Sequence, residues 1–192
     1  MINEADTFTP SSQKDWRQWL EQNHQSKQSV WLVCYKKQAN IPTVSWSESV
    51  DEALCFGWID STRKSIAENT FMQFFCKRKP KSAWSKINKM NVERLIAAGK
   101  MAKAGYESIE TAKQNGSWNL LDDVEELIIP ADLEKELQQN PDAKEYFLSL
   151  SKSVRKMMLQ WIAFAKRDET RRKRITEIVE SSAQKTKPKP FR

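Results

Sequence analysis

The hydrophobic pattern of this chain changes from strand-like to helical at Lys81, and this change limits the fold more than any other feature. Before Lys81, residues 29–37, 58–66 and 71–79 are rich in the β-branched and aromatic residues that are typical of strands. After Lys81, apolar residues recur at the helical spacing of three and four. The sequence therefore predicts an α+β fold, with a small antiparallel sheet and flanking helices in the N-terminal half and a helical C-terminal half.

The same pattern predicts three parts of the chain. Residues 1–81 are expected to form the α+β part with the small antiparallel sheet, and residues 82–184 a helical part packed on it. Residues 185–192 read KTKPKPFR, where Pro and Lys alternate without an apolar face. We expect them to form a disordered basic tail.

The composition suits a soluble globular protein, with 39% hydrophobic residues and a mean hydropathy of −0.72. No apolar run is long enough for a transmembrane helix, so we expect no membrane insertion. The opening MINEADTFTP carries acidic residues and no apolar stretch, so it does not resemble a secretory signal. The three cysteines are odd in number and show no C-x-x-C spacing. Reduced thiols and a cytoplasmic location are therefore expected.

His24 is the single histidine, and it lies in the polar stretch NHQSKQ. A zinc site or a histidine-dependent catalytic unit would rest on this residue alone, and neither has a supporting pattern. We predict a solvated surface histidine, no metal site and no cofactor.

Two basic regions stand out from an otherwise acidic chain of net charge +7. Residues 152–192 hold 13 Lys and Arg against 4 Asp and Glu, and residues 77–94 hold 7 against 1. Such clustering favours a local field that attracts anions. The alternative is that these side chains only solvate helix faces.

The segment FCKRKPKSAWSKIN, residues 75–88, is the densest cluster of functional residue types. We expect a helix from 82 to 99, capped by Ser82, whose first turn offers unpaired N–H groups to an anion. Arg78 supplies a guanidinium beside that helix start. Trp84, Ser85 and Asn88 are expected next to it, where an indole and an amide suit a small polar ligand. The alternative is ordinary capping, with Trp84 in the core.

A second cluster, LCFGWID at residues 54–60, places Asp60 after an apolar stretch. A carboxylate there needs a partner, and Arg78 from the next strand is the expected one. Lys37 and Trp58 complete the predicted neighbourhood of the site. The predicted ligand-binding set is therefore Lys37, Trp58, Asp60, Arg78, Ser82, Trp84, Ser85 and Asn88, and no catalytic residue is assigned.

Several motifs occur in an order that resembles the bacterial YdeI/OmpD-associated family, also called bacteriocin-protection proteins. They are LCFGWID (54–60), F-x-x-R-K-P-K-S-x-W-S-K-x-N, G-x-M-x-x-A-G (99–105) and AKRDETRRKRI (165–175). The W-x-x-W-L opening (16–20) and the V-W-L-x-x-x-K-K run (30–37) extend the resemblance. Ser61 departs from the usual Gly, and Cys76-Lys77 from a common Thr-Pro pair, beside the predicted site.

The resemblance implies an association with an outer-membrane porin and a role in envelope stress or bacteriocin resistance, without assigning catalytic residues. We expect a bacterial protein that binds a small anionic ligand, with a protein partner left open. Two alternatives remain. One is an enzyme acting on a phosphorylated or carboxylated metabolite, with Asp60 or Glu48 as the acid or base. The other is a nucleic-acid or protein-interaction module using the basic C-terminal region. Nucleic acid is the less favoured partner, because no known nucleic-acid-binding pattern is present.

Overall fold

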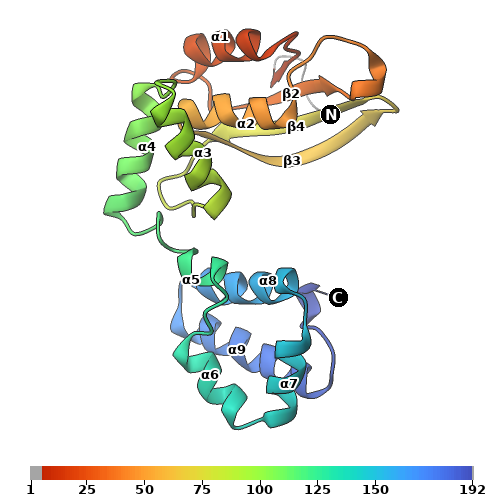
Figure 1. Cartoon of the computed structure of the whole chain (residues 1–192), viewed down its shortest axis with the longest axis vertical. Coiled ribbons are helices and arrows are strands. Elements are labelled where there is room, and N and C mark those ends of the chain that lie inside the picture. The colour runs from red at the N-terminus through yellow and green to blue at the C-terminus, as the bar shows by residue number, and fades with distance from the viewer. Residues whose placement is uncertain (1–5, 192) are drawn as a thin grey trace. The chain divides into compact units, whose positions relative to one another are not determined.

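The computed structural model describes residues 6–191 and divides the chain into two compact units, Met1–Trp118 and Asn119–Arg192 (Figure 1). The division therefore falls after Trp118 and not at residue 81, where the hydrophobic pattern changes. The reason is that the first two helices after Lys81 bury Val92, Leu95 and Ile109 in the same core as the sheet.

The N-terminal unit combines short strands with four α-helices among its described residues. In chain order its elements are β1 (Thr7–Phe8), α1 (Gln13–Asn23), β2 (Ser29–Tyr35), the 3₁₀ turn η2 (Lys37–Ala39), α2 (Trp46–Cys55), β3 (Trp58–Ala67), β4 (Thr70–Lys77), α3 (Lys86–Ala97) and α4 (Lys103–Gln114).

The four strands form one sheet in the order β1-β2-β4-β3. β4 pairs antiparallel with both β2 and β3, and the two-residue β1 pairs parallel with β2. β3 and β4 form the hairpin that the sequence predicted, with Trp58 opposite Lys77 at its open end. The predicted α+β class, with a small sheet flanked by helices, is confirmed.

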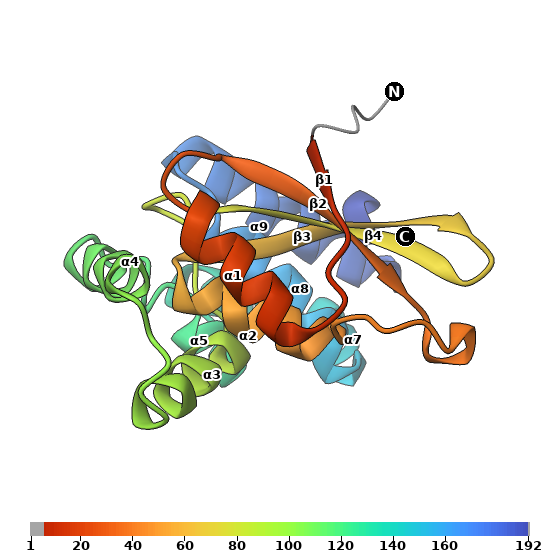
Figure 2. The same cartoon turned by 90° about the horizontal axis from the view of Figure 1, so that it is seen from above.

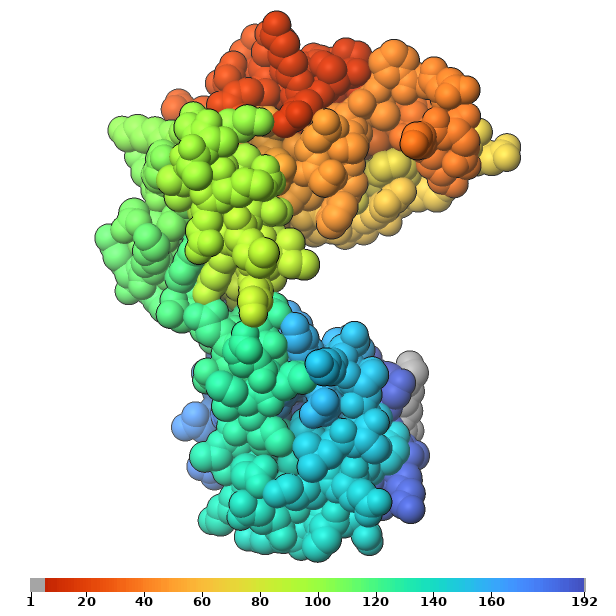
Figure 3. Space-filling model, in the orientation of Figure 1, coloured from red at the N-terminus to blue at the C-terminus, as the bar shows by residue number. Residues whose placement is uncertain are grey.

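Helices α1 and α2 cover one face of this sheet (Figures 1 and 2). Side chains alternate between the two faces of a strand, so every second residue of β2 is buried, as in Val30 and Leu32. Trp16 on α1 is fully buried, and its ring centroid lies 5.4 Å from that of Phe75 on β4. The apolar faces of α1 and β4 thus meet in one core, and this unit forms a closely packed body in the space-filling view (Figure 3).

The turn from α2 into β3 lies against the start of α4 at unusually short range. The Ala102 N–H donates to the Cys55 carbonyl over 3.0 Å. A Cβ on Gly105 would lie 2.3 Å from that same carbonyl oxygen, and one on Gly57 would lie 2.9 Å from the Ala104 oxygen. Gly57 also has φ +70°, which L side chains rarely adopt. Two glycines therefore allow α4 to dock on this turn.

Helix α3 begins at Lys86, which corrects the expectation of a helix start at Ser82. Ser85 is the N-cap, and its hydroxyl accepts a hydrogen bond from the Asn88 N–H. The Ser82 N–H instead donates to the Lys79 carbonyl in the preceding turn. Trp84 lies between these two serines in the sequence, and its side chain is buried in the core of the unit.

The C-terminal unit is helical in all its described secondary structure, which confirms the predicted helical half. Its elements are α5 (Asp122–Glu125), α6 (Ala131–Gln138), α7 (Pro141–Ser149), α8 (Lys152–Ala163), α9 (Asp168–Ala183) and the 3₁₀ turn η3 (Lys189–Phe191). The helices bury an apolar core that includes Leu133, Phe147, Met158 and Ile178.

The end of the chain has contacts within this unit, in contrast to the disordered tail expected from its composition. The Phe191 ring centroid lies 5.6 Å from that of Trp161, in an edge-on arrangement. The Lys189 N–H donates to the Glu177 carboxylate over 3.0 Å. Pro188 is buried. Within residues 6–191, no helix is long and apolar enough to cross a membrane.

Candidate functional site

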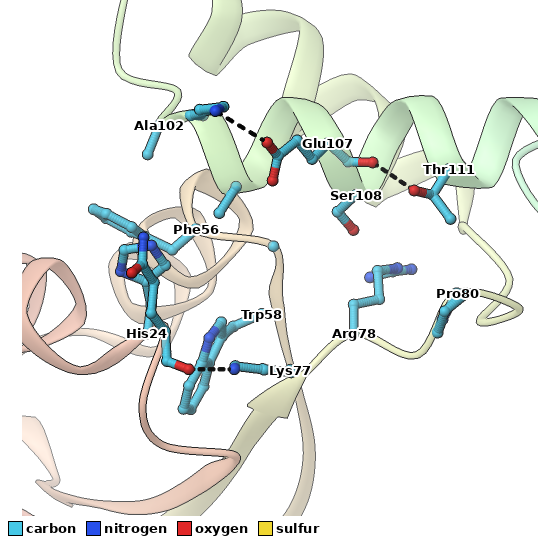
Figure 4. Close-up of a pocket in the computed structure, with 14 residues that line it drawn as sticks. His24, Phe56, Trp58, Lys77, Arg78, Pro80, Ala102, Glu107, Ser108 and Thr111 are labelled. Carbon is cyan, nitrogen blue, oxygen red and sulfur yellow. Dashed lines mark hydrogen bonds and ion pairs between the residues drawn. The ribbon is translucent and has the colours of Figure 1, made fainter.

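A cavity of about 630 Å³ opens in the N-terminal unit where four elements converge. They are the end of α1, the turn from α2 into β3, the end of β4 and one side of α4 (Figure 4). Its volume lies within the range of small-molecule sites. The lining residues are His24, Gln25, Phe56, Gly57, Trp58, Lys77, Arg78, Pro80, Ala102, Lys103, Ala104, Glu107, Ser108 and Thr111.

Arg78 is the most unusual residue of this lining, since its side chain is charged and only 8% exposed. Its Nη2 donates to the Ala83 carbonyl over 2.7 Å. Its Nε and Nη1 have no hydrogen-bond partner within residues 6–191. Burial lowers the pKa of Arg78 to about 10, although Asp60 acts at longer range in the opposite direction. The cavity wall therefore holds a positive charge without a paired carboxylate.

Two buried tryptophans belong to this region, one in contact with the guanidinium and one in the cavity lining. The Trp84 ring lies beneath it, with the guanidinium carbon 3.6 Å from the ring centroid. Trp58 lines the cavity, is 1% exposed and packs edge-on against Trp19. The indole N–H groups of both Trp58 and Trp84 have no acceptor in the described part of the chain. Because an unsatisfied buried donor costs free energy, the N–H of Trp58, which lines the cavity, favours an acceptor from outside the chain.

His24 and Lys77 bring further nitrogen atoms to the lining. His24 follows the last turn of α1, where its Nδ1 donates to the Leu20 carbonyl over 2.8 Å. This bond leaves Nε2 as the other ring nitrogen for a ligand or solvent. The Lys77 Nζ donates to the Gln25 carbonyl over 2.7 Å (Figure 4).

The α4 side of the cavity supplies hydroxyl groups and one carboxylate. Ser108 and Thr111 face Arg78 from this helix (Figure 4), and the Thr111 hydroxyl donates to the Glu107 carbonyl. The Glu107 carboxylate lies 3.6 Å from the Lys103 Nζ, and both side chains are largely exposed. Together the lining suits a ligand that accepts hydrogen bonds and carries negative charge.

Asp60 lies outside the cavity lining and forms no ion pair with Arg78, contrary to expectation. Its carboxylate accepts from the Trp46 Nε1 over 3.1 Å and from the Gln73 Nε2 over 3.3 Å. The register explains the difference, because Asp60 pairs with Phe75, three residues before Arg78. The carboxylate thus finds its partners on α2 and β4.

The other predicted site residues are distributed around the unit. Lys37 lies just after Tyr35, at the sheet end where β2 pairs with Thr70, and this is the end opposite Trp58 and Lys77. Ser82, Ser85 and Asn88 belong to the turn and helix start described above and do not line the cavity. The structure therefore brings Trp58 and Arg78 together there, with Trp84 behind Arg78.

Sequence reasoning missed the contributions of His24, Lys77 and α4. His24 carries no local signal, because its neighbours are polar and it lies at a helix end. The two glycines of the 54–60 and 99–105 motifs were the available signal, since close backbone contact requires glycine. Read together, Gly57 and Gly105 indicate that these motifs touch.

The remaining chemistry of the chain is sparse. In the described range, no group of three or more His, Cys, Asp or Glu side chains is placed to hold a metal ion. The cysteines are unpaired, and Cys34 and Cys55 are buried. In the C-terminal unit, several basic side chains are already paired, as in Arg171 with Asp132 and Lys156 with Glu125.

Comparison with known families gives two matches, each within one structural unit. Residues 126–185 match the family described as "Bacteriocin-protection, YdeI or OmpD-Associated", which confirms the family resemblance of the sequence. Residues 8–108 match the family described as "Domain of unknown function (DUF8412)". No curated protein and no solved structure matches the chain. Because the match over residues 8–108 covers more than half of the chain, the protein belongs to the DUF8412 family, with a YdeI/OmpD-associated segment in its C-terminal unit.

Proposed function

We propose that this protein binds a small anionic ligand in the cavity of its N-terminal unit. The observation that carries the proposal is Arg78, a charged side chain that is 8% exposed, lines the cavity and has no paired carboxylate among residues 6–191. A buried charge without a partner is costly, and a carboxylate or phosphate group in the cavity offsets that cost. Trp58 and Ser108 add donors of hydrogen bonds.

The ligand class is the same as the one expected from the sequence, but the groups that bind the anion differ. Ser82 and Ser85 are not part of the lining, and the N–H groups that they were expected to expose belong to a turn and a capped helix start. The helix start that does line the cavity is that of α4, at Lys103 and Ala104. The three unpaired thiols favour a cytoplasmic location for the protein.

The experiment is calorimetric titration of the full chain with inorganic phosphate, short carboxylates and nucleotides, combined with thermal unfolding. A charge-assisted contact contributes about 1.5–3 kcal/mol, so Arg78→Gln is expected to weaken binding roughly 10–150-fold. Arg63→Gln is the matched control, because it removes the same charge from an exposed position of the same unit. If no anion binds the wild type at millimolar concentration, the proposal is wrong.

A role for Arg78 in the fold alone gives a different result. The residue holds the Ala83 carbonyl and stacks on Trp84, so its loss can lower the melting temperature. In that case Arg78→Gln melts earlier in every buffer, while the stabilisation by an anion stays as large as in the wild type. The ligand role instead predicts that this stabilisation disappears.

An enzyme that acts on such an anion is the second candidate, favoured by one observation. His24 lines the cavity with its Nδ1 anchored on the Leu20 carbonyl, an arrangement that orients an imidazole for proton transfer. A metabolite screen for turnover tests it, with His24→Asn as the variant. Turnover that His24→Asn abolishes supports the enzyme, whereas binding without turnover leaves the binding function. A role in bacteriocin protection or envelope stress would then depend on which anion is bound.

A further inference from the structure

We infer that the ligand of this cavity carries two anionic groups, one at Arg78 and the other at the first turn of α4. The inference rests on the proposed function and specifies its ligand class as an elongated dianion, such as an α,ω-dicarboxylate. The two positions are independent features of the cavity. Arg78 leaves Nε and Nη1 without partners within residues 6–191, and the N-cap of α4 makes no side-chain hydrogen bond.

The Arg78 position is tied to the C-terminal end of α4. The carbonyl of Pro80, two residues after Arg78, accepts from the Asn115 Nδ2 over 2.8 Å and from the Ser117 hydroxyl over 3.1 Å. These bonds fasten the loop after β4 to the residues that follow α4. Figure 4 accordingly shows the Arg78 side chain opposite Ser108 and Thr111, beyond the first turn of this helix.

The second position is the N-terminus of α4, a helix of 12 residues. Its N-cap is Ala102, which has no side-chain acceptor for the first N–H groups. The Gly105 N–H donates to the Ala102 carbonyl over 3.0 Å. The N–H groups of Lys103 and Ala104 precede this bond and form the positive end of the helix dipole. Lys103 and Ala104 of this turn line the cavity, as does Lys77. An anionic group is therefore favoured here as well.

Buried side chains with unused donors point to a ligand between these two positions. Trp58 is 1% exposed, lines the cavity and has no acceptor for its Nε1–H within residues 6–191. Arg78 is 8% exposed and leaves Nε and Nη1 without partners in the same range. The one lining carboxylate, Glu107, is engaged by the Lys103 Nζ at 3.6 Å.

The length of α4 between the two positions sets the length of the ligand. Ala104 lies four residues before Ser108 and seven before Thr111, which corresponds to about 6–10 Å along an α-helix at about 1.5 Å per residue. Extended dicarboxylates from adipate to azelate hold their carboxylates at these separations. The wall between the two ends includes the apolar side chains of Phe56 and Trp58, which suits a methylene chain.

The test is calorimetric titration of the full chain with succinate, adipate, suberate and azelate, each compared with the monocarboxylate of equal length. We expect succinate to be too short and an affinity optimum between adipate and azelate, with a gain on the order of tenfold over the monocarboxylate from the second charged contact. Dicarboxylates that bind no better than monocarboxylates at every length overturn the inference.

The outcomes separate this inference from the proposed function. Monocarboxylates that bind the wild type and not Arg78→Gln support a site for one anion. If the second carboxylate then adds no affinity, the proposed function holds and the inference of a dianionic ligand is wrong. If no carboxylate or phosphate binds at all, both fail. An affinity that only rises with chain length, equally for both series, shows apolar binding and also overturns the inference.

Ala102→Ser tests the second position directly, because a serine hydroxyl at an N-cap accepts from the first N–H groups. It is expected to remove most of the dicarboxylate advantage and to leave monocarboxylate binding unchanged. Ala98→Ser is the matched control, since it makes the same change at an exposed position outside the cavity lining. Should Ala102→Ser lower the melting temperature, Lys77→Gln replaces it, and the same selective loss is expected. Unchanged dicarboxylate preference in both variants contradicts the inference.

Discussion

The guanidinium carbon of Arg78 lies 3.6 Å from the centroid of the Trp84 ring, and Nη2 of the same group is bonded to the carbonyl of Ala83. The residue before Trp84 and the ring itself thus hold Arg78 from two directions. Trp84 in turn packs against Trp118 at 5.0 Å between ring centroids. The position of the cavity charge therefore depends on an aromatic wall on its far side.

Trp84→Ala is expected to cost about 3–5 kcal/mol of stability, because it removes a buried ring of the core. Trp84→Phe keeps a ring face under Arg78 and deletes an N–H that has no acceptor within residues 6–191, so we expect a smaller loss and retained anion binding. Urea denaturation and anion titration of both variants measure this. An equal loss of stability in the two variants contradicts a specific role for the ring face.

Gly105→Ala is expected to disturb the α4 contact, because its Cβ would lie 2.3 Å from the Cys55 carbonyl oxygen. Overpacking of this kind costs about 1–3 kcal/mol, and anion binding should weaken as α4 moves. Gly99→Ala is the control, because the new Cβ has open space around it. Its loss of stability should come only from backbone strain at φ +65°. If Gly105→Ala binds anions like the wild type, the docking of α4 does not shape the cavity.

The C-terminal unit should lose stability in acid through Asp132. Two hydrogen bonds from Arg171, of 2.6 and 2.9 Å, hold the pKa of Asp132 below its ordinary value. A lowered carboxyl pKa stabilises the fold above the ordinary value, and that stability is lost as the pH falls through the lowered pKa. Because the Asp132 side chain is 46% exposed, the effect is expected to be no more than about 1 kcal/mol.

Asp132→Asn removes this titration, so its stability should vary less with pH than that of the wild type. Thermal unfolding of the full chain from about pH 3 to about pH 7 compares them across the ordinary Asp value of about 3.9. Parallel pH profiles for the two proteins contradict the assignment.

Deletion of residues 186–191 is expected to destabilise the C-terminal unit, because the Phe191 ring packs edge-on against Trp161. An aromatic pair contributes about 0.5–1.5 kcal/mol beyond its buried area, so Phe191→Ala should reproduce part of the loss. A melting temperature unchanged by both alterations would mean that this segment contributes nothing.

Alkylation should distinguish the three thiols. Burial raises the pKa of Cys34 and of Cys55 to about 11, and it raises the pKa of Cys76 as well. Cys76 is half-buried whereas the others are buried, so we expect it to react first with iodoacetamide in the native protein. Mass spectrometry after unfolding should then find all three labelled. Faster labelling of Cys34 or Cys55 contradicts this order.

The hairpin and the helical half were predictable because their periodicity is local. The strand runs before Lys81 place Trp58 and Lys77 at one end of the hairpin, and this brought Trp58 and Arg78 into the predicted site. The cavity itself depends on the contact of Gly105 with the Cys55 carbonyl. Fifty residues separate these two positions in the chain, and no local pattern connects them.

The helix start shows a second limit of local reasoning. Ser82 and Ser85 are equally good N-cap residues by type, and three residues separate them. The choice between them is made by the burial of Trp84, which is 1% exposed and stacks on Arg78. Helix propensity depends on local sequence and does not report this tertiary contact. The predicted helix therefore began one turn too early.

The most direct test of anion binding beside Arg78 is nuclear magnetic resonance of the full chain labelled with ¹⁵N-tryptophan. Each of the 8 tryptophans gives one indole N–H signal, and Trp58→Phe assigns that of Trp58. On titration with inorganic phosphate or suberate, the Trp58 signal is expected to shift and saturate. The signal of Trp31, which lies on the opposite face of the sheet from the buried Phe75, should stay in place. A Trp58 signal that neither anion moves at millimolar concentration contradicts the account.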